Sequence, residues 1–424
     1  MQFFEIVGGT RLKGAVDISG AKNAALPIMA ASILVDGESI LHNVPDLADV
    51  GQMQTLLARL GVKSERDASG AMHLRVEDEM NAHAEYELVS KMRASVCVMG
   101  PLLAKRRRAQ VSMPGGCAIG DRPIDLHILG LQSFGADFEL VNGDVLLRAK
   151  KLKGNEVFLG GPFGSSVTAT ANVMMAATLA EGRTVIASAA CEPEVVDLAN
   201  YLNACGARVT GAGTPEITVE GVESLHGAEH RIIPDRIEAG TFMIAAAITN
   251  GDLELHGAKM EHMRALVDRL RRVGVVIERG EKGIAVSSSR RLEPVVITTQ
   301  PYPGFPTDLQ AQAMALLCLA DGNSVITEKI YPDRFLHVGE LNRMGAQLRK
   351  EGPTVIIEGV KRLVGAPVMA SDLRASAALI LAGLVAKGTT HVHRAYHIDR
   401  GYEAIEKKLA AVGANIRRMN ETSP

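Results

Sequence analysis

Leu57-Ala58-Arg59-Leu60-Gly61 ends a predicted amphipathic helix, and its pattern, Leu-x-x-apolar-Gly followed by Ala or Val, recurs five more times. The other copies end at Gly135, Gly206, Gly274, Gly345 and Gly413. A glycine directly after an amphipathic stretch is typical of a helix C-terminus. Because successive copies lie 68 to 74 residues apart, the sequence indicates six copies of one structural unit.

A second marker precedes each copy: a helix rich in Ala, Met and Leu that stops at a turn. The stops fall at Gly37, near Lys105, and at Gly182, Gly251, Gly322 and Gly388. Each unit then has the order helix, strand, loop, helix, strand, turn, strand, with residues 206–210 and 216–220 as one predicted hairpin. The small-residue helices are apolar on nearly every side, which predicts that they are buried. We therefore expect an α/β fold with two similar halves of three units each.

The composition is that of a globular protein. With 424 residues, 47% of them hydrophobic and 22% charged, the chain is long enough for two or three domains. A net charge of -2 and an aromatic content of 4% without tryptophan disfavour a nucleic acid partner. The first residues lack the blocks of a signal peptide, and the longest apolar run, 375–386, is too short to span a bilayer. We expect a cytoplasmic protein with no membrane partner.

The five cysteines are odd in number and form no Cys-x-x-Cys pair, which disfavours a disulfide framework and a structural zinc site. Cys97, Cys205 and Cys318 lie in apolar helical patterns and are predicted to be core residues. Cys191 stays ambiguous.

The other common motif classes are weak. The chain has no phosphate-binding Gly-x-x-x-x-Gly-Lys-Ser/Thr motif and no dinucleotide fingerprint. His391, His393 and His397 fall on a predicted strand and its loop without a carboxylate cluster, so we interpret them as structural residues or as residues that support a nearby site. No metal and no cofactor is expected.

Cys117 lies in the stretch Ser112-Met113-Pro114-Gly115-Gly116-Cys117-Ala118-Ile119-Gly120-Asp121-Arg122-Pro123. Its three glycines and two prolines predict a loop. Arg122, five residues further on, favours the thiolate over the thiol. The loop alone is equally compatible with a functional thiol and with a free cysteine that happens to fall in a turn.

Polar residues mark the starts of the apolar helices. Asp, Ser and Thr at these positions are most simply explained as N-caps, although helix N-termini also attract anions. Lys22, Arg93 and Arg374 need another reason, because a cation near a helix start opposes the helix dipole.

Arginine recurs in the loop before the outer helix. Arg122 lies 13 residues before its repeat glycine, Arg334 lies 11 before and Arg400 lies 13 before, whereas the other three copies carry apolar residues there. A residue type found in half of the copies is not required by the fold. Taken singly, each arginine is compatible with a solvated surface. Together with Lys22 and the thiol they indicate a site for a small, highly charged phosphate or carboxylate.

Six motifs together closely resemble the UDP-N-acetylglucosamine 1-carboxyvinyltransferases, enolpyruvyl transferases of the EPSP synthase family, over essentially the whole chain. The motifs are Gly20-Ala21-Lys22-Asn23, Pro114 to Gly120, Arg122-Pro123-Ile124-Asp125-Leu126-His127, Phe305-Pro306-Thr307-Asp308, Asp372-Leu373-Arg374-Ala375-Ser376 and Tyr396 to Glu403. The resemblance implies a two-domain inside-out α/β barrel of six βαβαββ-type repeats. One domain, 22–231, would carry the cysteine loop 112–123, the other would join 1–21 to 232–424, and the active site would lie in the cleft between them.

The resemblance also implies the reaction: transfer of enolpyruvate from phosphoenolpyruvate to the 3′-hydroxyl of UDP-N-acetylglucosamine, the first committed step of peptidoglycan synthesis. The implied catalytic residues are Cys117, Asp308, Lys22 and Arg400. The implied phosphoenolpyruvate contacts are Lys22, Asn23, Arg122 and Arg400. The implied nucleotide-sugar contacts are Asn23, Arg93, Arg122, Pro123, Ile124, Asp125, Leu126, Ser166, Val167, Asp308 and Ile330. Supporting residues are His127, Arg334, Asp372 and Arg374.

One departure concerns Thr168, which stands where the family commonly has glycine in Ser-Val-Gly-Ala-Thr. Three other functions stay open. Enolpyruvyl transfer to a shikimate-type acceptor is disfavoured by Cys117, and a DNA clamp built from six units is disfavoured by the net charge. The third is a paralogue that binds nucleotide sugar without catalysis, and turnover measurements with both substrates would distinguish it from an enzyme.

Overall fold

The computed structural model describes residues 2–113, 123–289 and 291–421, and these form two compact units. We call the first the terminal unit, since it contains residues 2–19 together with the described part of 234–421. The second is the central unit, residues 20–113 and 123–233. The chain passes from one to the other after Ser19 and returns after Ile233.

The described residues of each unit form three four-stranded sheets, and all six sheets have one topology. Two parallel strands lie side by side, an antiparallel strand follows, and a second antiparallel strand lies at the edge. The sheets of the central unit are β18 (Glu229–Arg231), β4 (Glu38–His42), β6 (Met72–Val76), β5 (Val62–Arg66); β7 (His83–Ala84), β8 (Arg108–Ser112), β10 (Asp144–Arg148), β9 (Asp137–Val141); and β11 (Glu156–Phe158), β14 (Arg183–Ala187), β16 (Glu216–Glu220), β15 (Arg208–Thr210).

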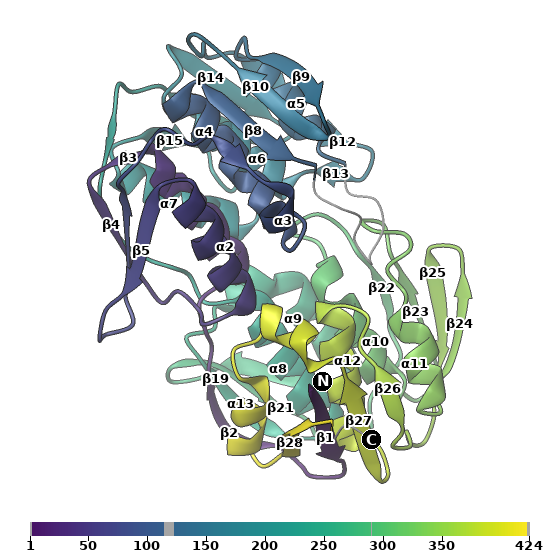
Figure 1. Cartoon of the computed structure of the whole chain (residues 1–424). Coiled ribbons are helices and arrows are strands. Elements are labelled where there is room, and N and C mark those ends of the chain that lie inside the picture. The colour runs from purple at the N-terminus through teal and green to yellow at the C-terminus, as the bar shows by residue number, and fades with distance from the viewer. Residues whose placement is uncertain (1, 114–122, 290, 422–424) are drawn as a thin grey trace. The chain divides into compact units, whose positions relative to one another are not determined.

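The terminal unit repeats this arrangement. Its sheets are β2 (Lys13–Asp17), β19 (Asp252–His256), β21 (Gly283–Ser287), β20 (Val276–Arg279); β22 (Val296–Thr298), β23 (Asn323–Thr327), β25 (Thr354–Glu358), β24 (Gln347–Glu351); and β26 (Pro367–Met369), β27 (Thr389–His393), β1 (Gln2–Val7), β28 (Asn415–Asn420). Figure 1 shows β1 beside β27 and β28, so strands from both ends of the chain share one sheet. Two short pairs in the central unit, β3 (Val35–Asp36) with β17 (Leu225–His226) and β12 (Gly160–Gly161) with β13 (Gly164–Ser165), complete the strands.

Helices rich in small residues lie inside each unit. In the central unit α6 (Val167–Ala177) contacts both α1 (Lys22–Ala31) and α4 (Met99–Arg106), and in the terminal unit α8 (Arg236–Ile248), α10 (Gln310–Leu317) and α12 (Leu373–Val385) contact one another. Almost every residue of these helices is buried. Alanine and glycine allow such helices to approach closely, because they add little side-chain bulk at the contact.

Amphipathic helices connect the strands of each sheet. They are α2 (Ala48–Arg59), α5 (Asp125–Gln132), α7 (Pro193–Ala204), α9 (Arg264–Val273), α11 (His337–Arg343) and α13 (Ile405–Ala411), with the single turn α3 (Tyr86–Val89) besides. A complete repeat, such as β22–α10–β23–α11–β24–β25, has the predicted βαβαββ order. The predicted two-part α/β fold with internal helices is confirmed, including the hairpin formed by β15 and β16.

The six repeat glycines have one backbone conformation. All of them, from Gly61 to Gly413, have φ between 77° and 104°, the left-handed region that glycine adopts without steric cost. The preceding stops are less uniform. Gly37, Gly182, Gly322 and Gly388 also have positive φ, but Arg107 takes this role near Lys105, and Asn250 takes it in place of the predicted Gly251. A Cβ on Gly251 would lie 2.7 Å from the carbonyl oxygen of Leu12, so a close approach requires that glycine.

The cysteines and the C-terminal histidines singled out in the sequence have defined positions in this fold. Cys97, Cys205 and Cys318 are buried, as predicted, and Cys191 is half-buried. His391 and His393 lie on β27, whereas His397 lies in a 3₁₀ turn, Ala395–Arg400. In the part of the chain that the structure describes, no helix is long and apolar enough to cross a bilayer.

Candidate active site

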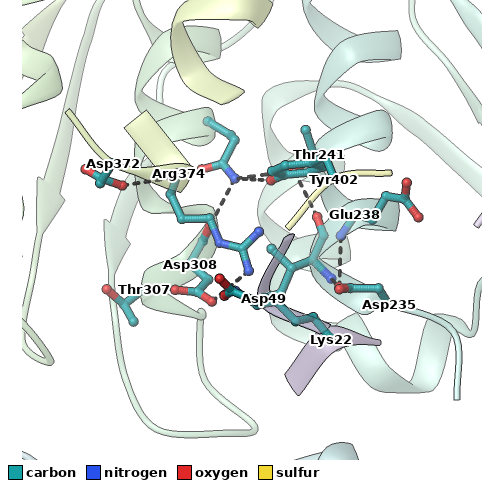
Figure 2. Close-up of polar contacts among 12 residues, drawn as sticks. Lys22, Asp49, Asp235, Glu238, Thr241, Thr307, Asp308, Asp372, Arg374 and Tyr402 are labelled. Carbon is teal, nitrogen blue, oxygen red and sulfur yellow. Dashed lines mark hydrogen bonds and ion pairs between the residues drawn. The ribbon is translucent and has the colours of Figure 1, made fainter. Parts of the chain in front are cut away.

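Asp308 lies in the terminal unit, in a 3₁₀ turn (Thr307–Leu309) that leads into the buried helix α10. One carboxylate oxygen accepts a hydrogen bond from Arg334 Nη1 at 2.9 Å and the other accepts from Arg374 Nη2 at 3.0 Å. Figure 2 shows Arg374 reaching toward this carboxylate. Both arginine side chains are almost fully buried, but 27% of the Asp308 side chain is exposed. The carboxylate is therefore held by two cations and still open to solvent.

The two arginines stay charged although they are buried. Burial is the largest single effect and lowers the pKa of each guanidinium, but the surrounding groups, led by the carboxylate of Asp308, together outweigh burial, so the pKa of both Arg334 and Arg374 is raised. For Arg334 the carboxylate of Asp372 adds to this effect.

The start of α12 explains why Arg374 tolerates its position near a helix N-terminus. Asp372 is the N-cap, and its side chain accepts hydrogen bonds from the main-chain N–H groups of Arg374 and Ala375 at 2.8 and 3.1 Å. The Arg374 guanidinium lies over the ring of Tyr402, 5.4 Å from its centroid. The N-cap interpretation is also right for Ser166 and Asp235, which cap α6 and α8.

A buried polar network, which we did not predict, lies behind Asp308. The hydroxyl groups of Tyr402 and Thr241 are 2.8 Å apart, and Gln312 donates to the Tyr402 hydroxyl and to the main-chain oxygen of Asp308. Figure 2 shows Thr241 and Tyr402 side by side. The signal in the sequence was a threonine and a glutamine inside otherwise apolar helices, because such buried groups need partners.

Glu328, directly after β23, is a second residue that sequence reasoning missed. Its side chain is fully buried and accepts hydrogen bonds from hydroxyl and main-chain donors, including Thr307 Oγ1 at 2.9 Å and the N–H of Ile330 at 2.8 Å. Ile330 is half-buried in the loop that begins here.

Lys22 lies in the central unit as the first residue of α1. Its ammonium group is 3.0 Å from the carboxylate of Asp49 on α2, and both residues are buried. Figure 2 labels both residues. The pair gives one physical reason for a cation at a helix start, where the dipole alone disfavours it. The sequence did not indicate Asp49 because the pairing depends on how α1 and α2 pack.

Gly20, two residues before Lys22, explains part of the first motif. A Cβ at this position would lie 1.7 Å from the carbonyl oxygen of Asn43, so only glycine fits. Asn43 in turn donates its side-chain amide to the carbonyl oxygen of Ile232 at 3.0 Å.

His127 is buried on α5 and connects to α6. Its Nδ1 lies 2.8 Å from the Asn172 amide nitrogen, and its Nε2 lies 3.1 Å from Thr168 Oγ1. The main-chain N–H of Gly100 donates to Asn172 Oδ1, which fixes the amide so that its nitrogen faces the ring. Nδ1 is therefore the acceptor, and Nε2 carries the hydrogen that Thr168 accepts. The residue at the departure from the family pattern thus joins the starts of α5 and α6.

The remaining predicted residues lie in both units. In the central unit, Asn23 is the second residue of α1, Arg93 starts a 3₁₀ segment (Arg93–Val98), and Pro123, Ile124, Asp125 and Leu126 lie at the start of α5, with Ser166 and Val167 at the start of α6. In the terminal unit, Arg400 is the last residue of the turn Ala395–Arg400. Cys117 and Arg122 lie outside the described residues.

The four described thiols are poor nucleophiles. Burial raises the pKa of Cys97 and Cys318 to about 12 and that of Cys205 to about 11, and it also raises the pKa of Cys191. A thiol without thiolate character does not react readily.

Comparison with known families is consistent with this arrangement. The family model described as EPSP synthase (3-phosphoshikimate 1-carboxyvinyltransferase) matches residues 6–409. The chain belongs to the EPSP synthase family. Family members of known name include the UDP-N-acetylglucosamine 1-carboxyvinyltransferase of Methylacidiphilum infernorum, 52% identical over 99% of both chains. That of Myxococcus xanthus is 54% identical over 97% of this chain and 98% of the relative.

Solved structures of the family share the fold. The enolpyruvyl transferase NikO from Streptomyces tendae has a TM-score of 0.90 at 24% identity, with 100% of this chain and 99% of the other covered. An EPSP synthase from Acinetobacter baumannii has a TM-score of 0.77 at 19% identity, with 99% and 100% covered. At sequence identities this low, the structural similarity shows that the fold is shared and carries no conclusion about activity.

Proposed function

We propose that this protein transfers the enolpyruvyl group of phosphoenolpyruvate to the 3′-hydroxyl of UDP-N-acetylglucosamine in the cytoplasm and releases phosphate, the first committed step of peptidoglycan synthesis. The observation that carries the proposal is identity of 52% to 54% over nearly the whole chain to enzymes of that name. The polar residues of both units fit the chemistry, because the reaction needs a base, an acid and cations, and no cofactor.

Asp308 is the proposed base for the addition step. As the 3′-hydroxyl oxygen forms a bond to C2 of phosphoenolpyruvate, its proton passes to the Asp308 carboxylate. The two carboxylate oxygens accept hydrogen bonds from Arg334 and Arg374, a carboxylate oxygen can accept more than one hydrogen bond, and 27% of the side chain is exposed, which allows a hydroxyl to approach it. C3 gains a proton at the same stage, which we assign to the Cys117 thiol.

The tetrahedral intermediate then collapses. The C2–O bond to phosphate breaks, the Cys117 thiolate takes back one proton from C3, and the carbon–carbon double bond is restored. Asp308 gives up its proton to solvent, from which the departing phosphate takes one, so both groups are regenerated and phosphate is the second product. Lys22, Arg122 and Arg400 are proposed to hold the phosphate and carboxylate groups, since charge-assisted hydrogen bonds from cations stabilise such oxygens.

We assign the remaining binding residues by the same resemblance. Asn23 would join the phosphoenolpyruvate contacts. The nucleotide-sugar contacts would come from the starts of α5 and α6, from Arg93 and from Ile330. Asp372 would support the site as the cap behind Arg374, in line with its two hydrogen bonds to main-chain N–H groups.

The decisive experiment measures phosphate release by the purified protein with phosphoenolpyruvate and UDP-N-acetylglucosamine. The matching family model is named after an enzyme that acts on 3-phosphoshikimate, so shikimate 3-phosphate serves as the competing acceptor. We expect release with the nucleotide sugar alone. Release with the shikimate compound alone would exclude the proposed acceptor, and release with neither would favour a binding protein.

A second experiment tests the thiol. Cys117→Ser should severely reduce turnover and abolish covalent labelling by the epoxide fosfomycin, whereas Cys191→Ser serves as a matched control with normal labelling. Labelling that survives Cys117→Ser would remove Cys117 from the mechanism, even if phosphate release confirms the reaction.

A further inference from the structure

Glu328 is a buried carboxylate to which the proposed reaction gives no role. One of its oxygens accepts three hydrogen bonds, from Thr299 Oγ1 at 2.6 Å and from the main-chain N–H groups of Ile330 and Tyr331 at 2.8 and 3.0 Å. The other oxygen accepts one, from Thr307 Oγ1 at 2.9 Å. All four partners are donors, so the side chain acts purely as an acceptor, as an ionised carboxylate does.

The bond to Thr307 determines which way its hydroxyl points. Because the hydroxyl proton is given to Glu328, the Thr307 oxygen presents a lone pair to Arg334, whose Nη1 donates to it at 3.1 Å. The same Nη1 donates to Asp308 Oδ1 at 2.9 Å. A continuous chain of hydrogen bonds therefore runs from Glu328 through Thr307 and Arg334 to Asp308.

The three hydrogen bonds to the first Glu328 oxygen, Oε1, act on a different part of the site. They fix the main chain at Ile330, one of the proposed nucleotide-sugar contacts, and Thr299 Oγ1 also accepts a hydrogen bond from the N–H of Lys329 at 2.8 Å. Glu328 thus fixes both the loop that carries Ile330 and the arginine that holds Asp308.

We propose that Glu328 is a positioning residue for the transfer reaction: it orients the Thr307 hydroxyl so that Arg334 is held on the Asp308 carboxylate, and it fixes the loop at Ile330. Glu328 acts through these groups and contacts no substrate. The inference rests on the proposed function, in which Asp308 takes the proton of the acceptor hydroxyl.

The first test is Glu328→Gln, which keeps the shape and changes the polarity. If the amide NH₂ faces Thr307, it donates to the hydroxyl oxygen and turns the hydroxyl proton toward the Arg334 cation. If the amide NH₂ faces the loop instead, it meets the main-chain N–H groups of Ile330 and Tyr331, which are also donors, so the hydrogen bonds that hold the loop are lost. Since a displacement of about 1 Å in a catalytic site costs on the order of 100-fold, we expect kcat to fall about 100-fold. KM for phosphoenolpyruvate should change by about twofold or less.

Substitutions of the two threonines separate positioning from general loss of stability. Thr307→Val removes the link to Arg334 and should lower kcat, whereas Thr307→Ser should restore it. Thr299→Val is the matched control, because it removes the same kind of hydroxyl bond from the same carboxylate without contact to Arg334. Because Thr299 also accepts the N–H of Lys329 in the loop that carries Ile330, KM for the nucleotide sugar should rise in this variant, whereas kcat at saturating substrate should stay within about threefold of the parent value. These variants keep the test valid if Glu328→Gln does not fold.

The double variant Thr307→Val/Glu328→Gln tests whether the two residues act through one chain. We expect its kcat to equal that of whichever single variant has the lower kcat, because the second substitution then removes nothing more from the same chain of hydrogen bonds. Independent, multiplicative losses would overturn the inference, and so would an unchanged kcat in Glu328→Gln or equal losses in Thr299→Val and Thr307→Val. Failure of the proposed function has a different signature, since the parent protein itself would then release no phosphate from these substrates.

Discussion

Glu238 offers a quantitative test of the packing in the terminal unit. It lies in the first turn of α8, 2% exposed, and its carboxylate accepts hydrogen bonds from Lys408 Nζ and from the main-chain N–H of Ser19, both at 2.7 Å. Burial raises its pKa from 4.5 to about 7, although Lys408 acts in the opposite direction. Ser19 is the last residue before the chain enters the central unit.

The sign and size of the effect on stability follow from these values. The native state holds the proton up to about pH 7, whereas the unfolded chain releases it near 4.5. The contribution of Glu238 to stability is therefore fully present below pH 4.5 and is lost as pH rises through 7. Between pH 5 and pH 8 this amounts to about 2.5 kcal/mol of unfolding free energy. Glu238→Gln cannot titrate, so it lacks this component.

The assay is urea unfolding of the parent protein and Glu238→Gln at pH 5 and pH 8. Pulse proteolysis with identification of fragments from 234–421 would assign the transition to the terminal unit, because two units need not unfold together. We expect the variant to gain about 2.5 kcal/mol relative to the parent on going from pH 5 to pH 8. Glu278→Gln, at an exposed position on β20, serves as the control with no such gain. A parent–variant difference that is equal at both pH values would refute the reasoning.

Three further predictions concern the central unit and the proposed substrate contacts. Gly20→Ala should lower the unfolding free energy by about 3 kcal/mol, because the added methyl meets the carbonyl of Asn43; Gly51→Ala, in open space on α2, should be neutral or stabilising. Arg400→Ala should raise KM for phosphoenolpyruvate about 10- to 100-fold and leave that for the nucleotide sugar nearly unchanged, and the reverse pattern would contradict its proposed role. Thr168→Val should cost about 1 kcal/mol in urea unfolding, because the bond from the buried imidazole is lost, and Thr168→Ser should recover it.

The fold was largely predictable because its signals are local. A helix that ends in a left-handed residue needs glycine at that point, and Gly61 and its five counterparts therefore mark the repeat in the sequence itself. The apolar helices were predictable for a similar reason, since a helix without a polar face must be buried. At two of the helix ends the left-handed residue is Asn250 or Arg107 instead of glycine. The sequence marks such an end less clearly, and the helix stops predicted at Gly251 and near Lys105 were one and two residues away from these positions.

The polar partners of the site were not predictable, because they depend on packing between segments far apart in the chain. Asp49 lies 27 residues from Lys22, and Arg374 lies 66 residues from Asp308. Lys22 and Arg374 stood out in the sequence as cations at helix starts, but nothing local identified the carboxylates with which they pair. The resemblance to a family named Asp308 and Arg374 as site residues, but it did not indicate that one carboxylate would join Arg334 and Arg374.

The repeat itself explains how one backbone pattern supports a specialised site. All six sheets share a topology, so the start of each buried helix is placed in the same way, and its side chains are free to differ. Asp235 and Asp372 cap their helices, which satisfies main-chain N–H groups. Asp308 sits at an equivalent start, but two buried arginines hold its carboxylate instead. We propose this carboxylate as the base of the reaction and Glu328 as the residue that positions one of the arginines that hold it. The position comes from the repeat, and the difference in function comes from the partners that each copy supplies.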